Sequence, residues 1–258
     1  MSTTIVHSGH MTVRQLRALW RQPWYVAITL MQPVIWLLLF GALFESVVEI
    51  PGFQGGDYVD FLTPGIVIMT ALFSAGWIGM GVIEDLDRGV MDRFLVSPVR
   101  RVSLIAGPLG QLATVIVIQS LIIVGLGAVT GASIDGGVAG IAALIGCAVL
   151  LAWAVGGLSI ALALVARKEE TLIGAVQFVV LPLTFLSSTF MQSNLVPGWI
   201  QEVGRYNPVN WAVEAGSETF EANVDWGFVA SRAGFLAALA AACAWLATRA
   251  FRSYQRSV

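Results

Sequence analysis

Six apolar stretches, almost free of charge, divide this chain and constrain its fold more than any other feature. They are Trp24–Phe44, Phe61–Ile83, Val102–Ile134, Gly136–Ala166, Thr171–Gln201 and Phe228–Thr248. An α-helix needs about 20 apolar residues to cross a hydrocarbon core of about 30 Å, and each stretch reaches that length. The longer stretches must include interfacial or loop residues. The sequence therefore predicts an all-α membrane protein with six transmembrane helices, in which residues 1–258 form a single transmembrane domain.

The basic residues predict the orientation. Six spans place both termini on one side, and all but two of the 14 lysines and arginines fall in segments on that side. The exceptions are Arg205 and Arg232. The positive-inside rule then predicts that both termini and the second and fourth connecting segments are cytoplasmic. Arg232 lies near the outer start of the last stretch, and we expect its side chain to snorkel or to pair with an outer carboxylate.

Residues 11–24, ahead of the first stretch, are predicted to form an amphipathic helix. At about 100° per residue, Trp20 lies on an apolar face, while Arg14, Arg17 and Arg21 form an adjacent stripe. This distribution suits the headgroup boundary, so we expect the helix to lie in the cytoplasmic interface. From these residues it is either a juxtamembrane anchor or a connecting helix that also touches a cytoplasmic partner.

The segment 84–101 is the most informative part outside the predicted spans. Leu86, Val90 and Phe94 recur at every fourth position, which predicts one face of a helix from Glu84 to Pro98. Charged residues of both signs surround that face: Glu84, Asp85, Asp87, Arg88, Asp92 and Arg93. The segment is therefore either a docking surface for a soluble protein or a solvated interfacial helix.

Residues 191–227 are too few for a domain and too apolar for an ordinary loop. Prolines and aromatic residues interrupt the segment, among them Pro197, Trp199, Pro208 and Trp211. Broken backbone near a membrane is tolerated where protein buries it or where it lines a cavity. We therefore expect one or two short re-entrant or interfacial helices on the outer face.

The chain lacks the residues that several kinds of chemistry require. Its only lysine, Lys168, lies outside any Gly-rich phosphate-binding loop. Both histidines, His7 and His10, lie in the polar N-terminal tail. The apolar stretches contain none of the carboxylates that proton relays use. We therefore expect no catalytic residue, no metal site, no cofactor bound by this chain and no nucleic-acid partner, and an energy source outside the chain.

Three motifs together resemble the type-2 permease family of ATP-binding cassette (ABC) transporters, closest to the daunorubicin-resistance-like drug-export permeases. The first motif lies in the charged inner segment and consists of Asp87, Gly89, Asp92, Arg93, Phe94 and Pro98. The second lies in the fifth stretch, where residues 181–190 match the pattern P-L-x-F-x-S-x-x-F. The third lies on the outer face, where Pro197 and Trp199 are followed by Asn207 and Pro208. The similarity covers essentially the whole chain.

The resemblance implies a permease in the plasma (inner) membrane that works with separate subunits. The helix from Glu84 to Pro98 in segment 84–101 would be the coupling helix, with its charged residues and Gly89, Phe94 and Pro98 as coupling residues. Two copies of a nucleotide-binding subunit would bind ATP and Mg and dock beneath it, and residues 11–24 would lie against it as connecting helix. A second permease subunit would pair with this one, and we expect a homodimer rather than a heterodimer. Membrane lipids would surround the pair. In the family the pathway is lined chiefly by the second and fifth spans, which implies five candidates here: Ser74, Trp77, Phe178, Phe185 and Ser188. The same residues are equally consistent with helix packing.

The expected function is export of an amphipathic drug, antibiotic or lipid-like molecule, driven by ATP hydrolysis in the partner subunit. A permease for a glycan or lipid-linked polymer is the nearest alternative, and such a permease would be expected to carry more aromatic and polar residues along its pathway. An ion-coupled carrier would require carboxylates or a polar stripe in the spans. A membrane assembly protein without transport activity would leave the charged inner segment without a partner.

Overall fold

The apolar stretches fold mainly into helices in the part of the chain that the structure, a computed structural model, describes. The description covers residues 23–49, 57–89 and 101–255. In these residues the elements are α2 (Pro23–Leu43), η1 (Glu45–Glu49), α3 (Tyr58–Gly76), α4 (Ile78–Asp87), α6 (Arg101–Val129), α7 (Gly137–Ala166), α8 (Glu169–Phe185), η2 (Ser193–Leu195), α9 (Gly198–Gly204), α10 (Pro208–Glu218) and α11 (Trp226–Gln255). No strand occurs among them. The all-α prediction is confirmed for this part of the chain.

Four helical segments of the described chain are long and apolar enough to cross a membrane. They are Tyr58–Asp87, which joins α3 and α4, and then Ile105–Val129, Gly137–Ala166 and Trp226–Phe251. The apolar part of α2, Leu30–Leu43, is shorter. Helix α8 has 17 residues, about 25 Å at 1.5 Å per residue, and begins with two glutamates. The number of six spans therefore stays a prediction, while a multi-pass membrane protein agrees with the structure.

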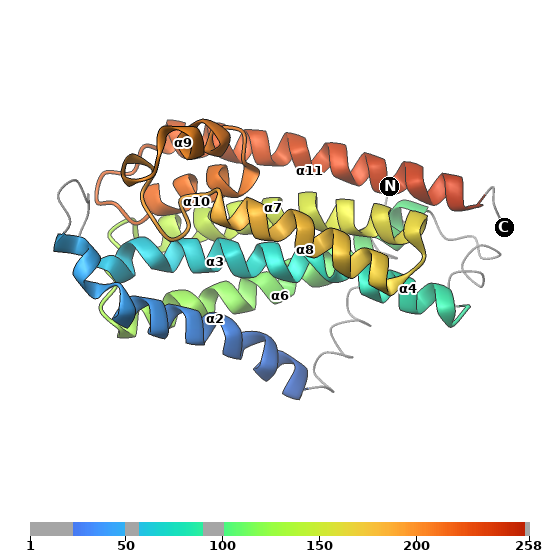
Figure 1. Cartoon of the computed structure of the whole chain (residues 1–258), viewed down its shortest axis with the longest axis horizontal. Helices are drawn as coiled ribbons and strands as arrows, with labels where there is room; N and C mark the ends of the chain where they lie inside the picture. Colours follow the sequence, from blue (N-terminus) through green and yellow to red (C-terminus); the bar gives the residue numbers. More distant parts are fainter. Residues whose placement is uncertain (1–22, 50–56, 90–100, 256–258) are drawn as a thin grey trace.

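Helix α3 lies at the centre of the bundle. Every residue from Leu62 to Leu72 is buried, because α2, α6, α7, α8 and α10 all pack against this helix. Helix α7 contains no charged residue and packs along α11 as well as against α3 and α6. Figure 1 shows these long helices running side by side along the longest axis of the molecule.

The two ends of the bundle differ in composition. The end of α4, the start of α8 and the C-terminal end of α11 lie together at one end, on the right of Figure 1. We call it the basic end, because Arg88, Arg167, Lys168 and Arg249 belong to those segments. The opposite end carries η1, α9 and the turn between α6 and α7. The described segments therefore alternate between the two ends as the charge pattern predicts.

Small residues allow the helices to approach closely. A Cβ atom on Gly127 of α6 would lie 2.7 Å from Thr63 Oγ1 on α3, and one on Gly65 of α3 would lie 2.6 Å from the Thr189 carbonyl oxygen. A Cβ on Gly140 of α7 would collide with the Thr219 carbonyl oxygen at the end of α10. These separations are below any normal carbon–oxygen contact, so the packing requires glycine at each position.

One predicted boundary is wrong. The predicted helix from Glu84 to Pro98 does not run unbroken, because α4 ends at Asp87 and Gly89 adopts a φ of 64°, the left-handed conformation that ends helices. The fifth stretch, Thr171–Gln201, includes loop residues as expected, because α8 ends at Phe185 and turns follow. The expectation of short helices within residues 191–227 is confirmed by η2, α9 and α10. Their place relative to a membrane stays a prediction.

We expect Gly140→Ala to destabilise the fold by about 1–3 kcal/mol, because the new methyl group would force α7 away from the end of α10. The buried thiols of Cys147 and Cys243 allow unfolding in detergent to be followed with a thiol-reactive dye.

The matched control is Gly146→Ala on the same helix, where a Cβ would meet nothing within 4 Å. There the loss of backbone freedom in the unfolded chain should leave stability unchanged or slightly raised. Equal melting temperatures for the two variants would contradict the packing.

Candidate coupling and transport sites

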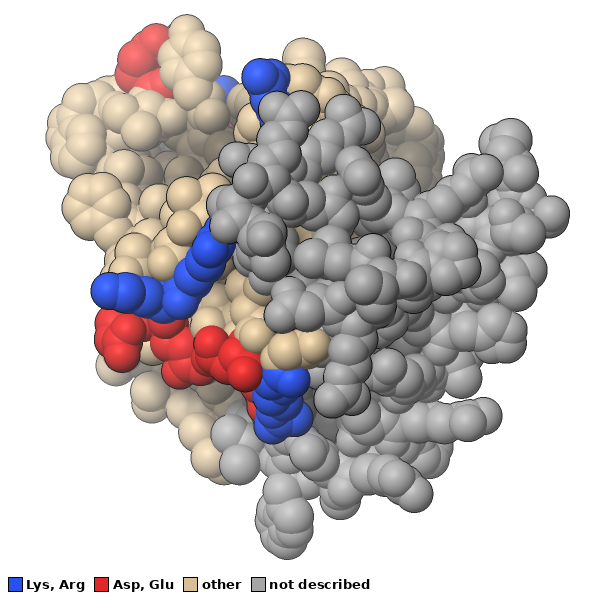
Figure 2. Space-filling view, turned by 90° about the vertical axis from the view of Figure 1, so that its right-hand side faces the viewer, with Lys and Arg blue, Asp and Glu red and all other residues tan. Residues whose placement is uncertain are grey.

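The basic end presents charged side chains of both signs in one area. Figure 2 looks onto this end and shows acidic and basic side chains gathered on one part of it. Among the predicted coupling residues, Arg88 pairs with Glu84 at 2.5 Å, and both side chains are more than half exposed. Such an exposed pair adds little stability, so its charges are available to a partner. Asp85 is half-buried, and Asp87 is exposed beside them.

The other predicted coupling residues, Asp92, Arg93, Phe94 and Pro98, lie outside the described residues. The same holds for the connecting-helix residues Arg14, Arg17, Trp20 and Arg21. Helix α2 is described from Pro23 onward.

A second charged segment lies at the basic end next to α4. Helix α7 ends at Ala166, and Arg167 adopts a left-handed φ of 52° that turns the chain sharply into α8. Glu169 and Glu170 occupy the first turn of α8, where the helix dipole favours negative charge. Because α4 packs against both α7 and α8, this turn and the end of α4 form one continuous charged surface. The sequence-based prediction included only the α4 side of it.

The structure distributes the five predicted pathway residues over different surroundings. Ser74 of α3 donates a hydrogen bond to Gln119 Oε1 of α6, 3.3 Å away. Trp77 is partly buried between α3 and α4. Phe178 and Phe185 of α8 are 80% and 63% exposed. Ser188 is buried in the turns that follow α8. Within this chain the five residues therefore do not share one environment.

Helix α8 uses only a narrow stripe to contact its own chain. Its buried residues, Leu172, Val176, Val180 and Thr184, recur at every fourth position. Close packing on this stripe is visible at Gly76 of α3, where a Cβ atom would lie 2.8 Å from the Val176 side chain. Most of the remaining surface of α8 is exposed: Phe178 is the most exposed of its large side chains, and Phe185 contacts the Phe190 ring, with 6.0 Å between the ring centres.

The second and third sequence motifs meet in space at the end of α8. The side chain of Asn207 donates hydrogen bonds to the carbonyl oxygens of Leu183 and Leu186, at 2.7 and 2.9 Å. Its Oδ1 accepts from the Val209 N–H at 2.9 Å, so the same residue caps the start of α10 with Pro208 following it. Asn207 is 3% exposed and therefore serves the fold. Of the other outer-motif residues, Pro197 precedes α9, and Trp199 is exposed on it.

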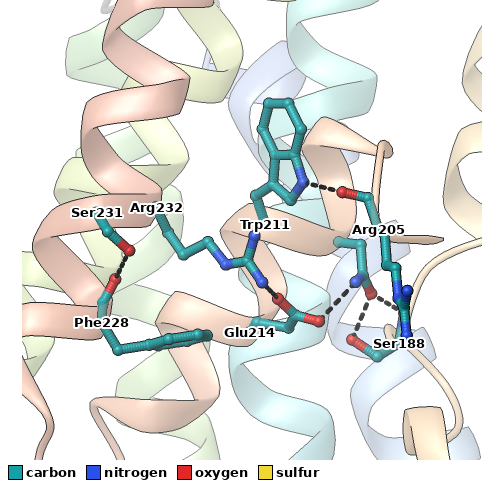
Figure 3. Close-up of polar contacts among 8 residues, drawn as sticks. Ser188, Arg205, Trp211, Glu214, Phe228, Ser231 and Arg232 are labelled. Atoms are coloured by element: carbon teal, nitrogen blue, oxygen red, sulfur yellow. Dashed lines mark hydrogen bonds and ion pairs between the residues drawn. The ribbon is translucent and has the colours of Figure 1, made fainter. Parts of the chain in front are cut away.

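A chain of polar contacts continues from this point to α11 (Figure 3). The backbone N–H and the hydroxyl of Ser188 both donate to Asn210 Oδ1, at 2.9 and 2.8 Å. Asn210 donates to Glu214 Oε1 at 2.7 Å, and Arg232 of α11 pairs with Glu214 Oε2 at 2.7 Å. The guanidinium also lies 5.0 Å from the centre of the Phe228 ring. Of the two expectations for Arg232, snorkelling or pairing with a carboxylate, the structure shows the pairing, while the outer position of Glu214 stays a prediction.

Sequence reasoning did not identify Asn210, Glu214 and Gln119. A lone carboxylate in the apolar sequence WAVEAG is the signal that could have indicated Glu214. Gln119 is only 3% exposed. Its sequence gives no comparable signal, because a single uncharged polar residue in an apolar helix is common. Within the described residues, no group of three histidines, cysteines or acidic residues could hold a metal ion.

These features define a multi-pass membrane protein with an apolar bundle and one charged end. The chain belongs to the ABC-2 type transporter family, which matches residues 8–220. It is 27% identical over 259 residues to the daunorubicin resistance ABC transporter permease protein DrrB1 of Streptomyces coeruleorubidus, covering 98% of this chain and 87% of the relative. It is 29% identical over 214 residues to the putative transport permease ycf38 of Porphyra purpurea, covering 82% and 72%. It is 22% identical over 183 residues to the probable doxorubicin resistance permease protein DrrC of Mycobacterium tuberculosis, covering 71% and 65%.

Membership of this family makes the chain a permease subunit of an ABC transporter, which is not itself a catalyst. It also implies association with an ABC ATPase subunit. The resemblance in the three sequence motifs is thereby confirmed at the level of the family.

We expect Glu214→Gln and Arg232→Gln each to destabilise the protein by about 2 kcal/mol, because each leaves a half-buried charge without its partner. The cost is below that of a fully buried pair, since the two side chains are 25% and 23% exposed. The double variant should lose less unfolding free energy than the sum of the two single losses. The same thermal unfolding experiment with a thiol-reactive dye measures all three.

Arg205→Gln is the control, because the Arg205–Glu202 pair is exposed and its loss should change stability by less than about 0.5 kcal/mol. Additive effects of the two buried changes would show that Glu214 and Arg232 do not interact.

Proposed function

We propose that this chain is the permease subunit of an ATP-driven exporter that moves an amphipathic drug, antibiotic or lipid-like molecule out of the cell. Six spans, formed by α2, α3 with α4, α6, α7, α8 and α11, would cross the plasma membrane. The similarity over 98% of the chain to a daunorubicin resistance permease carries this proposal.

The bundle itself supports an external source of energy. No charged side chain in the described part of the chain is fully buried, and the half-buried Glu214–Arg232 pair belongs to α10 and to the start of α11. Ion-coupled carriers place ionisable groups inside the bundle. A bundle without them suits a permease that is moved by a separate ATPase.

The proposed orientation places the basic end in the cytoplasm. Arg88, Arg167, Lys168 and Arg249 lie at that end, and the positive-inside rule favours it as the cytoplasmic side. Both termini would then be cytoplasmic. The opposite end, with α9 and α10, would face outward, so that the Asn207 cap and the Arg232–Glu214 pair lie in the outer half of the protein.

The coupling segment, residues 84–101, would dock into the ATPase subunit. Its charges of both signs, together with Arg167 and Lys168 beside it, supply a surface complementary to a soluble partner. Residues 11–24 would lie against it as connecting helix. Two copies of the ATPase subunit, which bind ATP and Mg, and a second permease, in a homodimer, would complete the transporter.

The proposed pathway uses the exposed surface of α8 together with α3. Phe178 and Phe185 present large apolar rings that their own chain leaves mostly exposed. Aromatic rings provide much apolar contact area and can stack with planar cargo. With Trp77 and the hydroxyls of Ser74 and Ser188, they would suit a molecule with an apolar body and polar substituents.

We expect the charge reversal Asp92→Arg with Arg93→Glu to abolish association with the ATPase subunit, because it inverts the electrostatic pattern of the docking surface. The chain is co-expressed with its ATPase subunit, reconstituted in lipid nanodiscs, and assayed for co-purification and ATP turnover.

The matched control is Glu202→Arg with Arg205→Glu, which reverses an exposed pair at the opposite end of the bundle. It should leave association intact. The docking assignment fails if the reversal at 92 and 93 leaves co-purification and turnover unchanged.

We expect Phe178→Ala and Phe185→Ala each to raise the daunorubicin concentration for half-maximal ATPase stimulation by about ten-fold, or ~1.4 kcal/mol. The physical reason is the loss of aromatic contact with the cargo. Phe235→Ala on α11, a Phe of similar exposure, should change it less than about two-fold. Equal changes in the half-maximal daunorubicin concentration at all three positions would contradict the assignment of α8 to the pathway.

A further inference from the structure

The long span formed by α3 and α4 is interrupted at Trp77, and we call residues 76–79 the Trp77 joint. Helix α3 ends at Gly76 and α4 begins at Ile78. The N–H of Met80 donates to the carbonyl of Trp77, three residues back, at 3.0 Å. In a continuous α-helix that N–H would bond to the carbonyl of Gly76. The joint therefore frees a backbone carbonyl within the bundle.

A side chain from another helix occupies the joint. The hydroxyl of Ser159 on α7 donates to the Gly76 carbonyl at 2.6 Å and accepts from the Gly79 N–H at 3.1 Å. Ser159 is 4% exposed. Because a hydrocarbon interior contains no water to form hydrogen bonds, a backbone group without such a partner would lower the stability of the fold. One hydroxyl thus bridges the end of α3 and the beginning of α4.

Glycine on both sides of Trp77 makes this bridge possible. A Cβ atom on Gly79 would lie 2.7 Å from both the carbonyl oxygen and the hydroxyl oxygen of Ser159. A Cβ on Gly76 would lie 2.8 Å from the Val176 side chain of α8. The joint is therefore in direct contact with α7 on one side and with α8 on the other.

The position of the joint gives it leverage over the coupling segment. Helix α4 has 10 residues, about 15 Å, and its last turn is the beginning of segment 84–101. A rotation of about 10° at the joint moves the far end of α4 by roughly 2–3 Å. The same rotation reorients Trp77, a proposed pathway residue, so that docking surface and pathway share one hinge.

We propose that Ser159 is a positioning residue for transport, whose hydroxyl sets the angle between α3 and α4 and so transmits movement of the ATPase to the pathway. This rests on the proposed function of segment 84–101 as the docking surface. Ser159 itself lies inside the bundle and touches neither ATP nor cargo. Loss of the Ser159 hydroxyl should therefore leave binding of the ATPase subunit intact and weaken only the transmission of the ATPase movement to the pathway.

The first test separates docking from transmission. The chain in nanodiscs, as wild type, Ser159→Ala and Thr70→Ala, is titrated with the ATPase subunit to obtain its Kd and the stimulation of ATP turnover. Thr70 is the matched control, because its buried hydroxyl bonds only to the Ile66 carbonyl of its own helix, at 2.7 Å. For Ser159→Ala we expect an unchanged Kd and about ten-fold less stimulation of ATP turnover. A ten-fold change corresponds to the free energy of about one lost buried hydrogen bond. Thr70→Ala should match wild type.

The second test measures the joint without the ATPase. Spin labels replace Arg88 and Val165, both exposed, in a chain whose Cys147 and Cys243 are changed to alanine. Ser159→Ala should broaden the distance distribution between the labels, while Thr70→Ala should not. If Ser159→Ala fails to reach the membrane, Ser159→Cys, with its weaker thiol donor, replaces it in the first test and should show the same pattern at smaller amplitude, and Ser159→Gly, which also lacks the hydroxyl, replaces it in the spin-label test.

The two tests have distinct failures. The inference is overturned if Ser159→Ala behaves like Thr70→Ala in either test, or if it weakens the Kd as much as turnover. Failure of the wild-type chain to bind the ATPase subunit would instead overturn the proposed function, and the spin-label distances would still decide whether Ser159 sets the joint.

Discussion

Backbone N–H and C=O groups inside a membrane cannot form hydrogen bonds with water, and this constraint explains most of the polar contacts in the bundle. Long helices satisfy it by themselves, but the chain breaks its helices at Trp77 and after Phe185. At each break a side chain from another element supplies the missing partners, Ser159 in the first case and Asn207 in the second. Both residues are nearly fully buried. The interruptions are thus fixed parts of the architecture, and they occur in the two helices that the family resemblance assigns to the pathway.

Charge and hydropathy were sufficient to predict the helical class, the alternation of segments between two ends and the pairing of Arg232. These properties follow from the free energy of transfer, which each residue carries regardless of its neighbours. The end of α4 was missed because Gly89 in a left-handed conformation outweighs the apolar repeat of Leu86, Val90 and Phe94. Ser159 and Asn210 were missed because a single polar residue in a helix has the same local pattern whether it bonds to its own turn or across to another helix.

The polar contacts at the opposite end join three segments that are distant in the sequence. Ser188 follows α8, Asn210 and Glu214 lie on α10, and Arg232 lies on α11. Through them the end of α8 and the start of α11 are held together with α10. At the basic end, by contrast, α4 is joined to α3 through the Trp77 joint. The fold thus combines a cross-linked end with an end at which, in the proposed mechanism, the ATPase subunit would move α4.

The narrow buried stripe of α8 makes two properties of this helix separable. Packing within the chain depends on Leu172, Val176, Val180 and Thr184. Substitutions on the other faces would change what α8 meets outside its own chain with little effect on that packing. The surface of α8 could therefore be redesigned for a different molecule while the scaffold stays intact.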